Sequence, residues 1–195
     1  MKHKLSLLLF LLVFSSNAFA QNRAVEKRPQ AYLLSSGDTR TAISRPRYAN
    51  VSDHKSNGKC KKDFKLEKKV FDLINEQRAE NGLTELDWSD EVAEIARLHS
   101  ENMANFSFFS HTDLDGLMVN DRADALGIKK WRAIGENIAF NHGYKNPAES
   151  AVERWMQSAS HRENLLSNRW RESGIGIAVT EDGTYYFTEV FLLRR

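Results

Sequence analysis

The sequence contains three polar motifs, FFSHTDLDG (residues 108–116), GENIA (135–139) and WMQSASHRENLL (155–166). Each motif supplies one strong metal ligand or proton-transfer group: His111, Glu136 and His161 in turn. Two imidazoles and a carboxylate are the minimum set for a divalent-metal site or a general acid–base pair. Because the motifs are far apart in the chain, only a fold that brings them together can give them a shared function.

Residues 1–20 have the pattern of a secretory signal peptide. A basic start, Lys2–Lys4, precedes an apolar run, Leu5–Phe14, and Ala18-Phe19-Ala20 is a small-x-small cleavage signal. The alternative, a retained membrane anchor, is disfavoured because the run is too short for a hydrocarbon core of about 30 Å. No later stretch is apolar enough to span a membrane. We therefore expect cleavage after residue 20 and a mature protein that is secreted or periplasmic.

Residues 21–63 are expected to form a basic, disordered linker. They lack sustained hydrophobic periodicity, contain Pro29 and Pro46, and are rich in lysine and arginine. One interpretation is that the basic residues attract this segment to anionic envelope surfaces. The simpler interpretation is that the segment is a solvated linker without a partner. The formal net charge of the whole chain, +2, is too small to indicate a nucleic-acid partner.

The chain has a single cysteine, Cys60. A secreted domain with one cysteine has no internal disulfide, so packing must supply its stability. Cys60 does not follow the predicted cleavage site, and a lipid-modified N-terminus is therefore not indicated. The lysines on both sides of Cys60 place it in the predicted linker, where we assign it no function.

Residues 64–195 are expected to form one domain that opens with helices. All four tryptophans lie there, and about 130 residues can bury roughly two-thirds of their unfolded surface. Helical spacing of apolar residues predicts a helix around residues 70–77 that Gly82 ends. A second helix is expected to follow Ser89 as its N-cap, because acidic residues and then an apolar helical face come next.

The remaining elements follow from turn and capping signals. A third helix is expected over residues 119–126, and Asn146-Pro147 is a strong start for a fourth. The alternation of residues 174–180, the Asp182-Gly183 turn and residues 184–193 predict a β-hairpin. Residues 134–140 add a strand or extended segment, and Tyr185, Phe187, Glu189 and Phe191 are expected to share one face. Helices around a small antiparallel sheet make an α+β layered domain.

The polar residues of this domain each have a structural and a functional interpretation. His99 lies on an apolar helix face, so a buried histidine bonded to a neighbour is the better interpretation. A buried Glu136 would need a partner, and a nearby histidine is the natural one. His161 begins a helical turn that Ser160 can cap, and Glu189 is a charge among aromatic residues, either at the sheet rim or facing a polar site. The chain has no HExxH, Cys-x-x-Cys, P-loop or GxSxG motif.

Taken together, these segments resemble the CAP superfamily, which comprises the cysteine-rich secretory, antigen 5 and pathogenesis-related 1 proteins (SCP domain). The resemblance covers about residues 70–191 and is closest to compact bacterial members without disulfides. Its matching strings are ARLHSENMANFSFFSH, GENIA, WMQSASHRENLL, GIGIAV and YYFTEVF. The resemblance implies an α-β-α sandwich with a small antiparallel sheet between helical layers and a central cleft.

In that family two histidines and acidic residues line the cleft, and some members bind zinc or another divalent cation there. The resemblance places His111, His161 and Glu136 in these positions, as metal ligands with Glu136 as a candidate catalytic base. The second glutamate of the eukaryotic pattern falls on Ser158, so the full tetrad is absent. Glu189 is a candidate replacement from the last strand. The resemblance does not imply a required cofactor. The cofactor that it makes possible is Zn²⁺ or another divalent cation.

Three functions fit this resemblance. The first, which we favour, is a monomeric binding or interaction module for an envelope, lipid or protein ligand. The second is a metal-dependent hydrolase, such as a protease, in which Glu136 activates a metal-bound water. The third is a structural role, in which the polar residues satisfy one another inside a groove. The missing second glutamate and the weak link between fold and chemistry favour the binding module over the enzyme.

Overall fold

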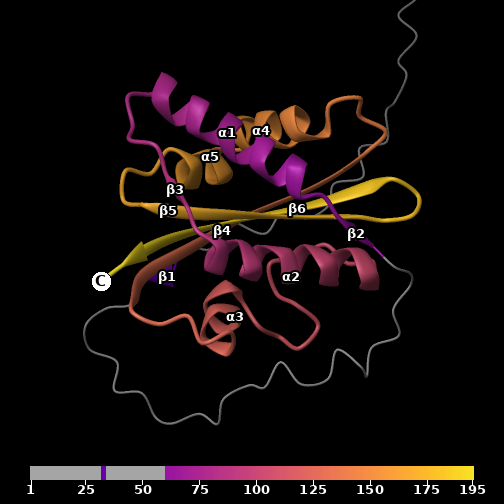
Figure 1. Cartoon of the computed structure of the whole chain (residues 1–195), viewed down its shortest axis with the longest axis horizontal. Coiled ribbons are helices and arrows are strands. Elements are labelled where there is room, and N and C mark those ends of the chain that lie inside the picture. Colours follow the sequence, from indigo (N-terminus) through magenta and orange to yellow (C-terminus); the bar gives the residue numbers. More distant parts are fainter. Residues whose placement is uncertain (1–31, 34–59) are drawn as a thin grey trace, which may run out of the picture.

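The structure, a computed structural model, describes residues 32–33 and 60–195. The predicted signal peptide and most of the predicted linker lie outside these residues. The described residues form three layers, with a central sheet between two layers of helices (Figure 1). The helices are α1 (Phe64–Glu80), α2 (Asp90–Phe106), α3 (Val119–Ala125), α4 (Pro147–Gln157) and α5 (Ala159–Leu165).

The sheet has the strand order β1-β4-β6-β5-β2, and all of these neighbours are antiparallel. A further short strand, β3, pairs in parallel with β5. The long strands β4, β6 and β5 carry the fold, and the hairpin predicted at Asp182-Gly183 joins β5 to β6. The strands are β1 (Tyr32–Leu33), β2 (Lys61–Lys62), β3 (Asp87–Trp88), β4 (Trp131–His142), β5 (Glu172–Val179) and β6 (Thr184–Arg194).

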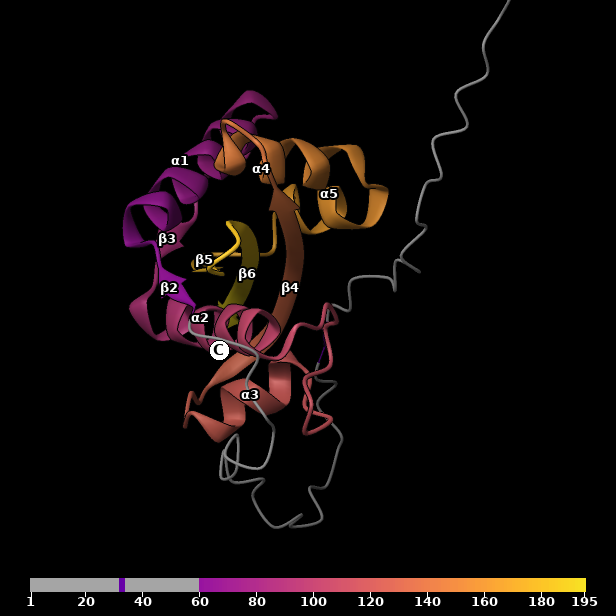
Figure 2. The same cartoon turned by 90° about the vertical axis from the view of Figure 1, so that its right-hand side faces the viewer.

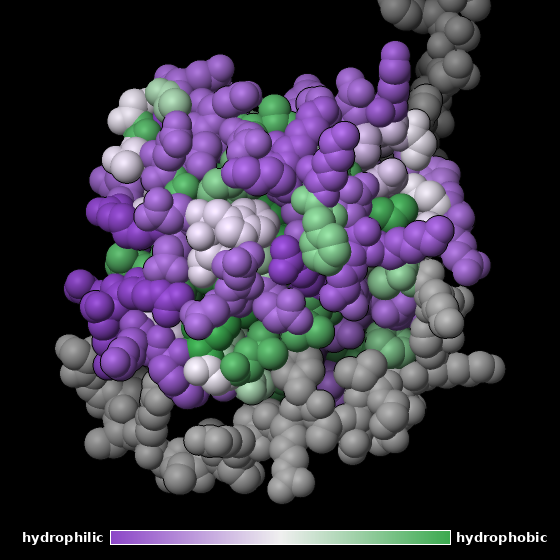
Figure 3. Space-filling view, in the orientation of Figure 1, coloured by the Kyte–Doolittle hydropathy of each residue, from purple (hydrophilic) through white to green (hydrophobic). Residues whose placement is uncertain are grey.

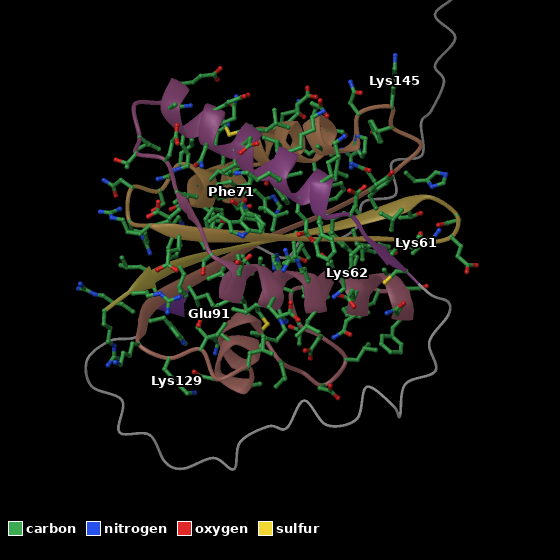
Figure 4. The ribbon with its side chains drawn as sticks, viewed as in Figure 1. Lys61, Lys62, Phe71, Glu91, Lys129 and Lys145 are labelled. Atoms are coloured by element: carbon green, nitrogen blue, oxygen red, sulfur yellow. The ribbon has the colours of Figure 1, made fainter. Side chains whose placement is uncertain are left out.

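The two faces of the sheet bury two separate hydrophobic cores. Phe187 and Phe191 of β6 pack with Trp155 and Trp170 in the core under α1, α4 and α5, and Figure 4 shows Phe71 in the layer between α1 and the sheet. Alternate residues of β6, such as Val190, face the second core under α2 and α3. The alternation follows the period of two in a β-strand. The predicted α-β-α sandwich, an α+β fold, is thereby confirmed.

Two glycines allow α2 to pack directly against β5. A β-carbon at Gly174 would lie closer than 3.0 Å to backbone atoms of Val92 and Ala93. At Gly176 it would overlap the backbone of Ala96 and Arg97 in the same way. Because the obstructing atoms are main-chain atoms of a helix, no side-chain rotation can relieve the overlap. The two glycines that alternate with Ile175 and Ile177 are therefore required for this packing.

The helices begin and end close to the predicted residues, but some of the predicted capping hydrogen bonds are absent at the described helix ends. Gly82 adopts a positive φ just after α1, as a helix-ending glycine does. Ser89 and Asn146 occupy the N-cap positions of α2 and α4, but neither side chain bonds to the helix. The hydroxyl of Ser160 does not cap α5, because Ser160 lies inside that helix and Ser158 precedes it.

Within residues 21–63, the predicted linker, the structure describes residues 32–33 and 60–63. Tyr32–Leu33 forms β1 against β4, and Lys61–Lys62 forms β2 against β5. Cys60 is half-buried rather than exposed, and its N–H donates to Asn105 Oδ1 at 3.2 Å. Asp63 then caps α1 by accepting the N–H of Leu66. The folded domain thus begins before the predicted boundary at residue 64.

The face of the molecule shown in Figure 3 is largely hydrophilic, and its hydrophobic residues occur in small groups. This distribution is ordinary for a domain whose apolar residues fill internal cores. None of the helices within residues 60–195 has the length and apolar character that a bilayer crossing requires.

Candidate functional site

His111 lies in the loop between α2 and α3, and the loop is held by a network of buried bonds. The α2 helix ends at Ser107, which adopts a left-handed conformation with a φ of 52°. Asp113 then fixes the loop, because its Oδ1 accepts the N–H groups of Asp115 at 3.0 Å and Leu117 at 2.8 Å. His111 is 8% exposed. The loop therefore presents His111 in a defined position on the β4 side of the molecule.

Glu136 of β4 is the centre of a buried cluster with His111 and Arg122, which we call the Glu136 cluster. His111 Nδ1 lies 2.7 Å from Glu136 Oε1, and Arg122 Nη2 lies 2.5 Å from Glu136 Oε2. Arg122 Nη1 also donates to the carbonyls of His111 and Leu117, at 3.0 and 2.8 Å. Both carboxylate oxygens of Glu136 are thus engaged, and a buried carboxylate obtains the partners that it requires.

The electrostatics of the cluster keep Glu136 ionised. Burial alone would raise its pKa, but the Arg122 guanidinium and the hydrogen bond from His111 outweigh burial and lower the pKa to about 2. An ionised carboxylate accepts hydrogen bonds, so His111 carries its proton on Nδ1. In the neutral imidazole the lone pair is then on Nε2. A histidine whose Nδ1–H is bonded to a carboxylate binds a metal ion through this Nε2 atom.

Arg122 is the member of the cluster that the sequence analysis missed. It is 0% exposed in the middle of the short helix α3. The signal in the sequence is its spacing, because Val119, Arg122 and Ala123 follow the i, i+3, i+4 pattern of a buried helix face. A charged residue at a core position of such a pattern needs a buried partner of opposite charge.

His161 lies on α5, in the opposite helical layer from the His111 loop. Figure 2 shows α5 in the layer with α1 and α4, and the loop between α2 and α3 in the other layer, both on the β4 side. The main chain of α5 is tied to β4: Asn137 Nδ2 donates to the His161 carbonyl at 3.1 Å. Asn164 Nδ2 donates to Asn137 Oδ1 at 3.1 Å and to the Glu136 carbonyl at 3.3 Å. Asn137, interpreted as structural from the sequence, thus fixes the backbone that carries His161.

Ser158 and Glu189 lie apart from the Glu136 cluster. Ser158 forms the break between α4 and α5, and its hydroxyl lies 3.3 Å from that of Ser160. Glu189 is 0% exposed on β6, where it pairs across strands with Asn137 and its Oε1 accepts the Ser173 hydroxyl at 3.3 Å. Glu189 Oε2 has no hydrogen-bond partner among the described residues. Its side chain faces the α1–α4 layer, away from the face that holds Glu136.

A groove of about 720 Å³ runs along α5 and the turn that follows it. Ser160 and Asn164 contribute to its lining, together with the charged residues Arg162, Glu163 and Arg169. His111 and Glu136 are not part of its lining. The lining of the groove therefore includes neither His161 nor the Glu136 cluster.

His99 has the structural role expected from its place on an apolar helix face. It is 0% exposed, and its Nε2 lies 2.8 Å from the Ser110 carbonyl. Burial, with a smaller effect of the nearby Arg122, lowers the pKa of His99 to about 4. His99 is thus neutral at neutral pH and anchors the start of the loop that carries His111.

Glu189 is expected to give the fold a pH-dependent stability. Burial raises the pKa of Glu189 from 4.5 to about 8. Between these pH values the folded protein holds a proton that the unfolded chain releases, so the free energy of unfolding falls as the pH rises. This stabilisation is complete below about pH 4.5 and is lost as the pH passes through about 8.

The variant Glu189→Gln, which is neutral at every pH, is expected to remove this slope of up to about 1.4 kcal/mol per pH unit. Urea unfolding between about pH 5 and 9 measures it, with the exposed Glu85→Gln as the matched control. If the profiles of wild type and Glu189→Gln run parallel, Glu189 is ionised in the folded protein.

A model of the cysteine-rich secretory protein family, CAP, matches residues 71–191. The match includes the loop of His111, β4 with Glu136, and both α4 and α5. The chain belongs to the CAP family. The resemblance inferred from the five segments is thereby confirmed, and the match covers nearly all of the folded domain that the structure describes.

Two proteins of Bacillus subtilis (strain 168) are related to this CAP domain in sequence. The uncharacterized membrane protein YlbC is 38% identical over 128 residues, which are 66% of this chain and 34% of YlbC. The uncharacterized protein YkwD is 34% identical over 110 residues, or 56% of this chain and 41% of YkwD. The chain thus spans well under half the length of either relative.

Solved structures of bacterial proteins share the fold. An extracellular protein with an SCP domain from Bacillus anthracis str. Ames has a TM-score of 0.58 at 29% identity, over 67% of this chain and 41% of that one. An outer surface protein from Borrelia burgdorferi has a TM-score of 0.64 at 21% identity, over 71% of this chain and 99% of that one. The second likeness concerns the fold alone.

Proposed function

We propose that this CAP domain is a binding module that works outside the cytoplasm, for an envelope, lipid or protein ligand. The N-terminal signal-peptide pattern of residues 1–20 supports this location. So does the similar extracellular protein with an SCP domain from Bacillus anthracis. The Glu136 cluster and the loop of residues 107–118 form the proposed recognition site.

The observation that carries the proposal is the bonding of Glu136, because His111 and Arg122 engage both of its carboxylate oxygens. A general base works best when its pKa lies near the operating pH, whereas His111 and Arg122 hold the pKa of Glu136 at about 2. A carboxylate with both oxygens engaged is a fixed anion that orients its partners. This arrangement supports a preorganised binding surface over a hydrolase in which Glu136 takes a proton from water.

A three-ligand metal centre does not fit the residues present. Within residues 60–195, no three histidine, cysteine, aspartate or glutamate side chains are grouped so that they could hold a metal ion. Glu136 is already bound by His111 and by Arg122, whose positive charge opposes a cation next to Glu136. His111 and His161 are the histidines that the family resemblance proposes as ligands for Zn²⁺ or another divalent cation.

A titration with Zn²⁺ is expected to reveal weak binding at most. Two histidines without a protein carboxylate leave the other coordination positions to water. We expect less than about a tenfold difference in Zn²⁺ affinity between the wild type and the double variant His111→Ala/His161→Ala, measured by isothermal titration calorimetry. A difference beyond about a hundredfold would mean that the two layers close into a metal centre.

The binding function is tested with three probes and one control variant. The purified protein is titrated with phosphatidylglycerol–phosphatidylethanolamine vesicles, with soluble neutral oligosaccharides and with denatured casein. We expect saturable binding of at least one probe. We also expect that the bound probe is not cleaved and is recovered intact. Absence of binding to all three contradicts the proposal. Cleavage of a probe by the wild type but not by folded Glu136→Gln would instead support the metal-dependent hydrolase.

A further inference from the structure

Two exposed aromatic side chains and a half-buried one form a continuous group beside the Glu136 cluster, and we call it the aromatic shelf. It consists of Phe109, Phe140 and Tyr186. The Phe109 and Phe140 ring centroids lie 4.9 Å apart at 67°, and those of Phe140 and Tyr186 lie 6.1 Å apart at 26°. Phe109 and Phe140 are 41% and 42% exposed. None of the three belongs to either hydrophobic core.

The shelf is rigid because the sheet supports two of its three rings. Phe140 of β4 and Tyr186 of β6 are directly opposite each other in the register, and cross-strand neighbours lie on the same face. Phe109 comes from the loop that also carries His111. Single exposed apolar residues are common on protein surfaces, but three contiguous rings held in fixed positions are typical of a binding surface.

The shelf lies on the same face of β4 as Glu136. Side chains two residues apart share a strand face, so Glu136, Ile138 and Phe140 form one row. Four residues of strand separate Phe140 from Glu136 by about 13 Å. Phe109 is only two residues from His111. A ligand that covers both the shelf and the Glu136 cluster is therefore an extended one.

Beyond the rings, the same face offers hydrogen-bonding groups. His142 and Thr184 form the next cross-strand pair on this face, and His142 Nδ1 lies 3.3 Å from Thr184 Oγ1. Asp182 in the hairpin turn accepts bonds from Thr180 and Thr184. An imidazole, hydroxyls and a carboxylate thus border an apolar ring surface.

The charges around the shelf disfavour an anionic partner. Lys62, in the same cross-strand row as Tyr186, is engaged by Glu101 at 2.7 Å. Glu181 and Asp182 add negative charge at the hairpin turn. Binding to anionic lipid requires clustered unpaired cations, whereas the cation in the row of the shelf, Lys62, is paired with Glu101. An uncharged partner with one apolar face and many hydroxyl groups matches it better.

We propose that the aromatic shelf binds a neutral polysaccharide chain. The C–H faces of the sugar rings pack against the exposed rings of Phe109 and Phe140, because the face of an aromatic ring carries partial negative charge. The sugar hydroxyls bond to His142, Thr184 and Asp182 at the border. This inference rests on the proposed binding function and names the chemical class of the ligand.

The test titrates the purified protein with four neutral oligosaccharides, namely the hexamers of β-1,4-linked N-acetylglucosamine, β-1,4-linked glucose, β-1,3-linked glucose and β-1,4-linked xylose. We expect saturable binding of at least one, seen by calorimetry and by saturation-transfer NMR. Phe109→Ala and Phe140→Ala are each expected to weaken it about tenfold. Phe140→Leu, which keeps the apolar volume but removes the ring, is expected to weaken it similarly. The matched control is Tyr144→Ala, because Tyr144 is 48% exposed but lies outside the shelf.

Three results would overturn the inference. The first is no saturable binding of any of the four oligosaccharides. The second is sugar binding that survives Phe109→Ala and Phe140→Ala in folded proteins, as judged by circular dichroism. The third is shelf-dependent binding of phosphatidylglycerol–phosphatidylethanolamine vesicles without sugar binding. In that last case the binding function stands and only the ligand class is wrong.

Discussion

Replacement of Arg122 by methionine is expected to lower the free energy of unfolding by about 3–5 kcal/mol at neutral pH. Arg122 is completely buried, and its guanidinium is the cation that neutralises Glu136. Methionine fills a similar volume without the charge, so Glu136 would remain as a buried anion with only His111 as a partner. The carbonyl of His111 would also lose the bond from Arg122, and that of Leu117 would keep only the N–H of Asp113. Urea or guanidinium unfolding measures the change.

Two controls separate the charge from the packing in this prediction. Arg132→Met, at an exposed position of β4, is expected to change stability by less than about 0.5 kcal/mol. In the double variant Arg122→Met/Glu136→Gln no buried charge remains, so part of the lost stability is expected to return. If the double variant is no more stable than Arg122→Met, the loss comes from packing and the lost carbonyl bonds.

The pH dependence of the same variant gives an independent check. In the wild type the pKa of Glu136 is about 2 in the folded protein, below its ordinary value of 4.5. Its ionised form therefore stabilises the fold above about pH 4.5, and this contribution is lost as the pH falls towards 2. Without Arg122, burial raises the pKa of Glu136 instead. The destabilisation by Arg122→Met is thus expected to be smaller at pH 4 than at pH 7.

The layered fold could be predicted because its signals are local. Gly82 and Gly127 end α1 and α3 in positive-φ conformations, and Pro147 begins α4 where the sequence indicated. The alternation on either side of Asp182-Gly183 made the hairpin visible. The strands β1 and β2 could not be found in this way. Each has two residues, which is too short for any periodicity, and its conformation depends on the edge strand that it pairs with.

The site was only partly predictable, because burial of a polar residue is decided by tertiary contacts. The cost of burying a carboxylate predicted a histidine partner for Glu136. His111 is that partner. Arg122 was missed because a short helix with one arginine usually exposes it. Of the two places expected for Glu189, the rim or a polar site, the sequence favoured neither, and its side chain lies in the interior beside Asn137 and Ser173. Nothing local in the sequence distinguishes a rim position from an internal one on the same strand.

Replacement of Gly176 by alanine is expected to destabilise the fold by about 3 kcal/mol or more. The added methyl group would overlap the main chain of Ala96 and Arg97, so α2 must move away from β5. That shift would also disturb the bonds of Ser100, which joins α2 to Gly176 O and Thr188 Oγ1 at 2.8 Å each. Chemical denaturation gives the change in unfolding free energy.

Gly183→Ala is the matched control for this prediction. Gly183 has a φ of +83°, but a β-carbon there would meet nothing within 4 Å. Alanine at that position carries only the cost of the left-handed conformation, about 1–2 kcal/mol. The two variants make the same chemical change, so the difference between their unfolding free energies isolates the contact between α2 and β5.

Because α2 also leads into the loop that carries His111, Gly176→Ala is further expected to weaken ligand binding at the Glu136 cluster. Equal effects of the two substitutions would show that α2 is free to shift, and that the close approach at Gly176 does not define the position of the site.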